Sequence, residues 1–240
     1  FNETMNNSLS VGAYYENNED YPAEKSVKIL NALSSDLNVM RQTLLYSGLE
    51  VLAFNLNRNV SNLKTFEFGN CYQKNIGAPD NLNVEKRFKE EKHLSLFVTG
   101  KLSNDSWQGK AQNADFFYLK NIVFNVLQRL RININNIEQK DCEAKYLSQG
   151  LSLVNKESKK VIAELGSVNN DLKKRFDIKQ DVFYADLNWD AIIKIMPKKE
   201  VQYANISKFP AVKRDLALVV DKDTSFASIE QIVKDCDKKL

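Results

Sequence analysis

Apolar residues recur at helical spacing in two long segments of the chain. In the first, the pattern runs from Leu37 to Leu56 with an interruption at Ser47-Gly48. Ser35 or Asp36 can cap its start by accepting a hydrogen bond from an early backbone N–H. We therefore predict two helical pieces or one kinked helix over 37–56. In the second segment, Asp115 can cap a core-facing helix whose apolar positions are Phe116, Leu119, Val123, Val126, Leu127 and Leu130.

Alternation of apolar and polar residues marks the strands. The half-buried strands that this pattern predicts are 65–72, 94–102, 146–154, 161–165 and 182–187. The segment Asn155 to Ser158 suits a hairpin turn between two of them, and Asn188 can cap a short helix from Trp189 to Met196. The polar segment Lys74 to Lys92 is expected to leave the sheet. Strands joined by hairpins and interrupted by helices predict an α+β fold, with a mainly antiparallel sheet flanked by helices.

Length and composition allow a sizeable core but exclude several classes of protein. The 240 residues are 43% hydrophobic and carry a net charge of only +3, so charge alone neither indicates nor excludes RNA as a partner. No run approaches the roughly 20 apolar residues of a membrane span. Phe1 is not an initiator methionine, so we expect a fragment or a processed chain, and we expect a cytoplasmic protein without membrane contact.

Few residues of the chain suit metal or nucleophilic chemistry. Cys71, Cys142 and Cys236 are far apart and odd in number, which disfavours a secreted disulfide scaffold and a structural zinc site. His93 is the only histidine, and its place after a charged run predicts a solvated surface side chain. The chain contains no glycine-rich phosphate loop of the nucleotide-binding kinds. We predict no catalytic residue, no metal ligand and no cofactor in this chain.

The C-terminal segment from Ser207 to Val220 contains its own structural signals. Pro210 biases Phe209 toward an extended backbone, and the apolar run from Leu216 to Val220 predicts a buried strand. A helix carrying Ile229, Ile232, Val233 and Cys236 should follow.

This segment closely resembles the entry to the ferredoxin-like anticodon-binding domain of bacterial phenylalanyl-tRNA synthetase beta subunits. Three earlier segments resemble the core of the same subunit, in the same order: Asn31 to Leu45, Asn55 to Arg58, and Phe66 to Gly69. The chain departs from the family where Asn31-Ala32-Leu33-Ser34 replaces Asn-Pro-Leu-Ser and where Tyr46-Ser47-Gly48 replaces Leu-Pro-Gly. Both departures remove a proline that would stiffen a turn.

The resemblance implies two domains. Residues 1–200 would form a class-II-synthetase-like core without activity, and residues 201–240 would form the truncated start of the ferredoxin-fold domain. The implied partners are the alpha subunit, a second beta subunit in a heterotetramer, and the tRNA specific for phenylalanine. The intact ligase would use ATP and magnesium, bound outside this fragment.

The motif positions agree with a silent core. Class II synthetases hold ATP with an arginine after their second-motif strand, where this chain has Cys71-Tyr72-Gln73-Lys74. A lysine lacks the planar fork of arginine that clamps phosphate. The third motif is also missing, because Gly166 to Asn170 offers no second glycine and no suitable arginine.

Two contact surfaces are suggested for the intact enzyme. Lys208, Lys213 and Arg214 are candidate contacts to tRNA phosphate, although Arg214 and Asp215 could equally form an internal ion pair. Apolar residues between Met40 and Leu56 exceed what one helical face needs, so they either contact the alpha subunit or enter the core of this domain. The alternative function is an independent α+β enzyme whose active site no linear motif reveals.

Overall fold

The chain forms two compact units, Phe1–Lys198 and Lys199–Leu240. The structure is a computed structural model that describes residues 1–32, 34–77, 83–103, 106–107, 109–198, 208–210 and 212–236. Ser207 and Ala211, within the predicted C-terminal segment, lie outside the described residues, as does Leu33.

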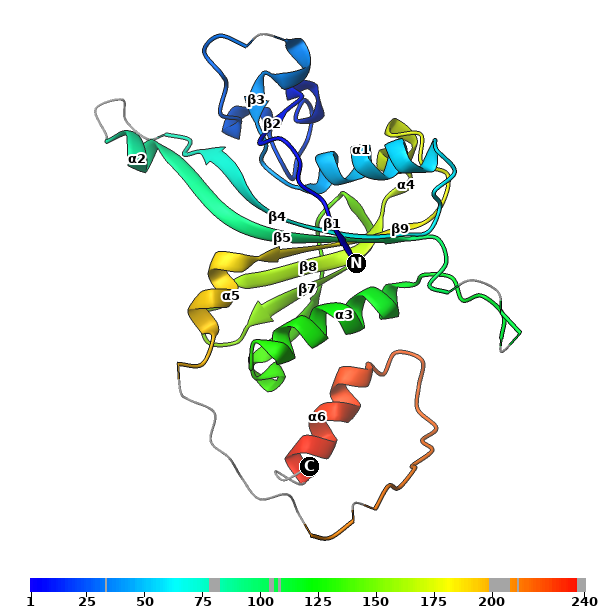
Figure 1. Ribbon diagram of the computed structural model, residues 1–240. Helices are drawn as coiled ribbons and strands as arrows, with labels where there is room; N and C mark the ends of the chain where they lie inside the picture. Colours follow the sequence, from blue (N-terminus) through cyan, green and yellow to red (C-terminus); the bar gives the residue numbers. More distant parts are fainter. Residues whose placement is uncertain are drawn as a thin grey trace. The chain divides into compact units, whose positions relative to one another are not determined.

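The first unit is built on a seven-stranded sheet (Figure 1). Its strands, in spatial order, are β1 (Asn2–Glu3), β4 (Leu63–Lys74), β5 (Phe88–Thr99), β9 (Val182–Asn188), β8 (Val161–Val168), β7 (Leu147–Asn155) and β6 (Ile137–Asp141). Every neighbouring pair is antiparallel except β1 and β4, which run parallel. The sheet prediction is confirmed, although β4 and β5 extend further than expected into the polar 74–92 segment. A short helix, α2 (Val84–Arg87), precedes β5 near the tip of that hairpin.

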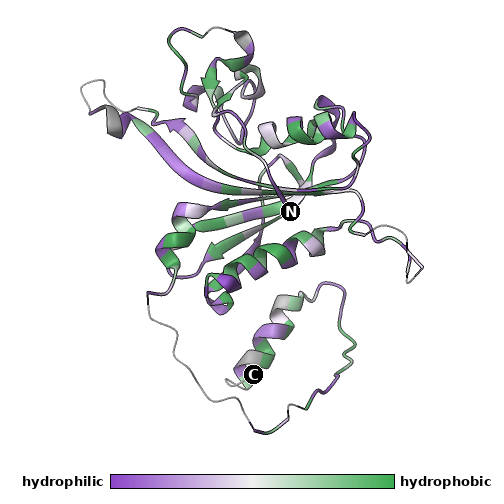
Figure 2. Ribbon diagram, in the orientation of Figure 1, coloured by the Kyte–Doolittle hydropathy of each residue, from purple (hydrophilic) through white to green (hydrophobic). Residues whose placement is uncertain are grey.

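Helices cover both faces of the sheet (Figure 1). On one face lie α1 (Leu45–Leu56) and α4 (Asn170–Arg175), and on the other α3 (Phe116–Arg129) and α5 (Trp189–Ile195). Figure 2 shows the resulting alternation of apolar and polar residues along α1 and α3. The predicted caps of two helices are confirmed: Asp115 accepts from the Tyr118 N–H at 2.7 Å, and Asn188 accepts from the Ala191 N–H at 2.8 Å. The α+β prediction is therefore confirmed.

Helix α1 begins later than predicted and is not interrupted. Residues Ser35–Leu37 form a 3₁₀ turn, and Val39–Met40 form a strand (β3) that pairs with β2 (Leu9–Ser10). The prediction of helix from Leu37 was wrong because backbone groups there pair with other segments. The Arg41 N–H donates to Ser8, and the Arg41 carbonyl accepts from Tyr72. Non-local hydrogen bonds thus outweighed the local apolar spacing.

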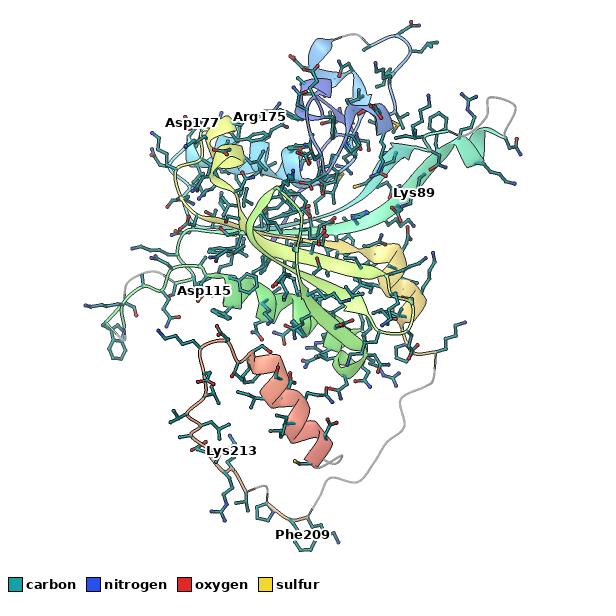
Figure 3. All side chains as sticks on the ribbon, turned by 180° about the vertical axis from the view of Figure 1, so that it is seen from behind. Lys89, Asp115, Arg175, Asp177, Phe209 and Lys213 are labelled. Carbon is teal, nitrogen blue, oxygen red and sulfur yellow. The ribbon has the colours of Figure 1, made fainter. Side chains whose placement is uncertain are left out.

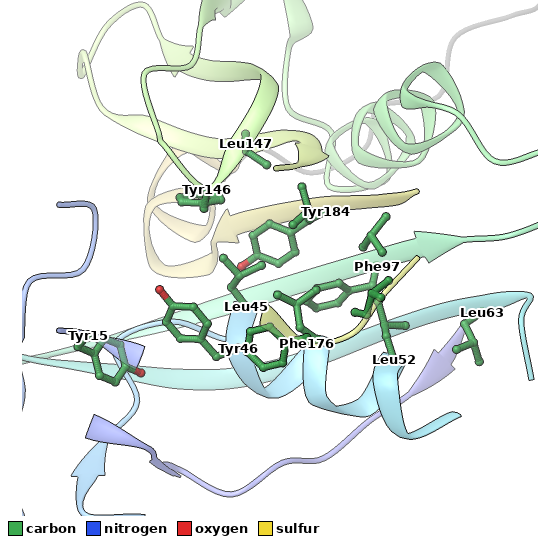
Figure 4. Close-up of a cluster of buried hydrophobic side chains, with 14 of the residues drawn as sticks. Tyr15, Leu45, Tyr46, Leu52, Leu63, Phe97, Tyr146, Leu147, Phe176 and Tyr184 are labelled. Carbon is green, nitrogen blue, oxygen red and sulfur yellow. The ribbon is translucent and has the colours of Figure 1, made fainter. Parts of the chain in front are cut away.

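Gly48 lets α1 approach the sheet closely. A Cβ atom at this position would lie 2.1 Å from the Phe97 ring of β5, a distance that forbids any other residue without movement of the helix. Tyr46, Leu49 and Leu52 are buried around this contact in the apolar cluster drawn in Figure 4. Ser47-Gly48 is therefore a packing feature inside the helix and does not break it.

The second unit contains the predicted C-terminal helix, α6 (Phe226–Cys236). The predicted buried strand over Leu216–Val220 was wrong for this chain, because the described residues of the unit form no strand there. Leu216 is 79% exposed and Val219 fully exposed. A strand that is apolar on both faces needs pairing strands and covering layers, and the described part of the unit supplies neither.

Candidate functional site

The sheet face under α1 is apolar at one end and polar at the other. Phe97 and Tyr184 pack under the helix, and the next residues on the same face are Ser95 on β5 and Asp186 on β9. Ser95 lies between Asp186 on one neighbouring strand and Glu67 of β4 on the other. We call this polar row, with the side chains that cover it, the sheet floor.

Arg41 and Glu67 form a buried ion pair on the sheet floor. The Arg41 Nη1 lies 2.7 Å from Glu67 Oε1, and the two side chains are only 6% and 3% exposed. Arg41 also donates to the carbonyls of Asn70 and Asn7, while Glu67 accepts from the backbone and side-chain nitrogens of Asn6. Gly69 leaves room for the guanidinium, since a Cβ there would lie 2.2 Å from Arg41 Nη2. Opposite charge and backbone acceptors thus already surround this arginine, which leaves it unsuited to holding a phosphate.

His93 is paired with Asp186 and is not the surface side chain that the sequence predicted. Its Nδ1 lies 2.9 Å from Asp186 Oδ1, and the two side chains are 16% and 15% exposed. The prediction was wrong because Asp186 lies on β9, 93 residues away in the sequence but on the neighbouring strand. Burial lowers the pKa of His93, but the Asp186 carboxylate and its hydrogen bond outweigh burial and raise that pKa overall.

Tyrosine side chains pack beside the sheet floor, and Figure 4 shows two of them, Tyr184 of β9 and Tyr146, which precedes β7. Tyr184 is fully buried, with its ring centroid 6.0 Å from that of Tyr146, and Tyr146 in turn stacks on Tyr21 at 5.7 Å. The Tyr146 hydroxyl donates to Glu164 at 2.7 Å. Burial raises the pKa values of Tyr21, Tyr146 and Tyr184 well above the ordinary value, so these phenols stay protonated and are no bases.

Other groups near the floor are equally unsuited to nucleophilic or metal chemistry. Burial raises the pKa of the Cys71 thiol well above its ordinary value, which keeps it in the unreactive protonated form. Within the described part of the chain, no three His, Cys, Asp or Glu side chains are grouped to hold a metal ion. A neighbouring pocket of about 600 Å³, lined by Tyr21, Tyr146 and Glu164 among others, contains more carboxylates than lysines.

The sequence analysis located the positions where the second and third synthetase motifs would stand. In the structure, residues at or near these positions either lie away from the sheet floor or take part in packing and ion pairing. Lys74 is exposed at the far end of β4. Gly166 lies inside β8, where a Cβ would be 2.2 Å from the Gln149 carbonyl, so this glycine permits close strand pairing. Lys173 of α4 is buried and pairs with Asp181 at 2.9 Å. The three predicted contacts to tRNA phosphate, Lys208, Lys213 and Arg214, are exposed in the second unit. Figure 3 shows Lys213 on the segment before α6.

A family model described as the phenylalanyl tRNA synthetase beta chain CLM domain matches residues 1–189. The chain belongs to this family. It is 45% identical over 240 residues to the phenylalanine–tRNA ligase beta subunit of Bacteroides thetaiotaomicron, which covers 100% of this chain and 29% of that relative. The corresponding subunit of Porphyromonas gingivalis is 37% identical over 240 residues, also with 100% and 29% covered. The chain thus spans 29% of the length of these beta subunits.

A solved structure extends the comparison to the fold. The chain is similar to a pyrrolysyl-tRNA synthetase of Desulfitobacterium hafniense with a TM-score of 0.56 and 16% identity, covering 81% of this chain and 62% of that one. This likeness shows the fold alone. The predicted beta-subunit family and the class-II-synthetase-like fold are both confirmed, and the relatives are subunits of a ligase. No helix among the described residues is long and apolar enough to cross a membrane.

The single histidine makes the His93–Asp186 pair directly measurable. Because folding raises the pKa of His93, the pair stabilises the fold below the unfolded pKa of about 6.5, and this stabilisation is lost as pH rises through the folded pKa. We expect NMR titration of its one set of imidazole resonances to give a pKa above that of an unfolded peptide.

The His93–Asp186 pair should also make the free energy of unfolding depend on pH. Urea unfolding should show His93→Gln to cost about 1.5 kcal/mol at pH 5 and less at pH 9, as expected for a hydrogen bond to a charged group. Equal losses at both pH values would show that His93 is neutral in the fold.

Proposed function

We propose that this chain is the non-catalytic core of a phenylalanine–tRNA ligase beta subunit. Within a cytoplasmic heterotetramer containing a second beta subunit, it would support the alpha subunit and contribute to tRNA binding while the alpha subunit charges tRNA with phenylalanine. The observation that carries the proposal is the closed sheet floor. Its buried arginine is neutralised by Glu67, and tyrosines occupy the space beside it.

The chemistry of amino-acid activation supports a silent role. Activation places developing negative charge on phosphate oxygens, which fixed cationic groups or magnesium must stabilise. Lys74, in the segment where the phosphate-binding arginine is expected, is exposed beyond the floor. Lys173, which follows the expected third-motif segment, is already paired with Asp181. ATP and magnesium would therefore bind in the alpha subunit.

An exposed apolar patch on the opposite sheet face is our candidate contact for the alpha subunit. Phe68 is 48% exposed and meets the Trp189 ring at 5.0 Å, and Ile193 of the same short helix α5 is 50% exposed. Patches of this kind on soluble domains mark protein contacts. By contrast, most apolar residues between Met40 and Leu56 lie in the domain's own core, and Phe54 is the large exposed one.

Charge placed in this patch should weaken assembly. We expect Phe68→Asp with Ile193→Asp in the full beta subunit to raise the dissociation constant for the alpha subunit at least about tenfold, because buried charge at an interface is left unpaired. Co-purification and sedimentation measure the effect. Phe54→Asp, 56% exposed on the other sheet face, is the matched control. If only the control weakens assembly, the contact lies on α1.

The silent-core proposal also predicts an absence of activation. The purified chain should give ATP–pyrophosphate exchange at background rate with phenylalanine, whereas the reconstituted alpha–beta enzyme should be active. Exchange or any other turnover by the chain alone would favour the alternative of an independent α+β enzyme.

Lys208, Lys213 and Arg214 are proposed to lie near tRNA phosphate in the intact subunit. Among the described residues Arg214 makes no recorded ion pair with Asp215, which favours a role outside the fold. In the full enzyme, Lys208→Ala with Lys213→Ala should raise the Kd for tRNA and reduce the slope of log K against log salt by about 1 to 2. Binding at several salt concentrations tests this. Wild-type affinity and slope would show that neither lysine contacts the RNA backbone.

A further inference from the structure

A second cationic feature lies in the first unit, at the outer end of the β4–β5 hairpin. A pocket of about 420 Å³ opens between the outer ends of these strands and the segment that follows Pro22. Among the described residues, its charged lining consists of Lys28, Lys74 and Arg87 together with the carboxylate of Glu24. Cationic side chains from three separate segments thus converge on one hollow, away from the sheet floor.

Several lysines of the first unit pair with a carboxylate, but the two lysines of this pocket do not do so among the described residues. Lys89, Lys145 and Lys173 each pair with a carboxylate. Lys28 and Lys74 are exposed, and the described residues give neither of them an ion pair. Their charge therefore remains available to an anionic ligand.

Two carboxylates of β5, among the hairpin residues that the structure describes, are engaged elsewhere. Glu90 accepts a hydrogen bond from the Asn70 side chain at 2.5 Å, and Glu91 pairs with Lys89 at 2.6 Å. Figure 3 shows Lys89 on the hairpin. Because these two carboxylates are directed to Asn70 and Lys89, they form no ion pair with Lys28 or Lys74.

An aromatic ring completes the pocket. Phe88 lines it, is 38% exposed, and lies directly opposite Lys74 in the β4–β5 register. An exposed ring beside a cation matches the chemistry of a nucleotide, because the ring can stack on a base while the cation meets the adjoining phosphate. Simple surface solvation would not require an exposed phenylalanine.

We propose that this pocket binds a backbone phosphate of RNA, with Lys28 and Lys74 as the phosphate contacts and Phe88 as a stacking surface. The proposal rests on the proposed function, in which the RNA is the tRNA of the ligase. A strand of RNA suits the pocket better than a free nucleotide does. Free nucleotides are usually enclosed by their sites, whereas both lysines here are exposed and can follow an extended backbone.

The test uses the full beta subunit assembled with its alpha subunit. Lys28→Ala with Lys74→Ala should raise the Kd for tRNA about tenfold at low salt and reduce the salt slope by about 1 to 2, as expected for two lost phosphate contacts. The matched control is Lys156→Ala with Lys160→Ala, two exposed lysines at the β7–β8 turn, which should leave Kd and slope unchanged. Phe88→Leu should raise the Kd severalfold with an unchanged slope, because only stacking is lost.

Several outcomes would overturn the assignment. If the wild-type complex binds tRNA better than the alpha subunit alone, and the Lys28 and Lys74 variant equals wild type, this inference fails while the proposed function stands. If the wild-type complex shows no such advantage, both fail. If the Lys28 and Lys74 variant loses binding of inorganic phosphate or ATP but binds tRNA as the wild type does, the pocket is assigned to a free phosphate compound. Loss of alpha–beta assembly would assign it to an acidic protein segment.

Discussion

The buried pair of Arg41 and Glu67 is the constraint on which the polar half of the first unit depends. Desolvating two charges is costly, and the cost is offset only when every remaining donor and acceptor is satisfied. Here the partners come from the N-terminal segment around Asn6, the segment before α1, and β4. One ion pair therefore fixes the relative position of three parts of the chain.

The same pair accounts for the functional character of the sheet floor. A site that activates phosphate esters needs cations whose charge is not already balanced. In this domain the buried cation is neutralised, the imidazole is held by a carboxylate, and the phenols are protonated donors. The charged side chains of the floor are thus directed to one another, while the buried hydroxyls of Ser95 and Tyr184 have no hydrogen-bond partner among the described residues. In the function that we propose, the sheet serves as a scaffold, and the contacts to partners lie on its periphery.

Local signals predicted much of this arrangement. The α3 helix and its Asp115 cap, the hairpins and the antiparallel sheet depend on residues close in sequence, so apolar spacing and capping residues revealed them. Three features depended on distant partners and were missed. The start of α1 is set by hydrogen bonds to Ser8 and Tyr72, the environment of His93 by Asp186, and the neutralisation of Arg41 by Glu67. No property of the sequence near those residues records these contacts. The family resemblance led to the prediction of a silent floor through missing motif residues, but it did not identify the side chains that close the floor.

The lengths of β4 and β5 have a mechanical consequence. Strand β9 pairs with β5 only from His93 to Thr99, whereas β4 and β5 stay paired to Lys74 and Phe88. The outer part of the hairpin is therefore a two-stranded ribbon that joins the larger sheet at one end. Its support lies where Gly69 meets Arg41 and where His93 meets Asp186. A load applied near the tip would be carried by cross-strand hydrogen bonds to this junction, where buried charge supports one face of the ribbon and the contact between the Phe68 and Trp189 rings supports the other.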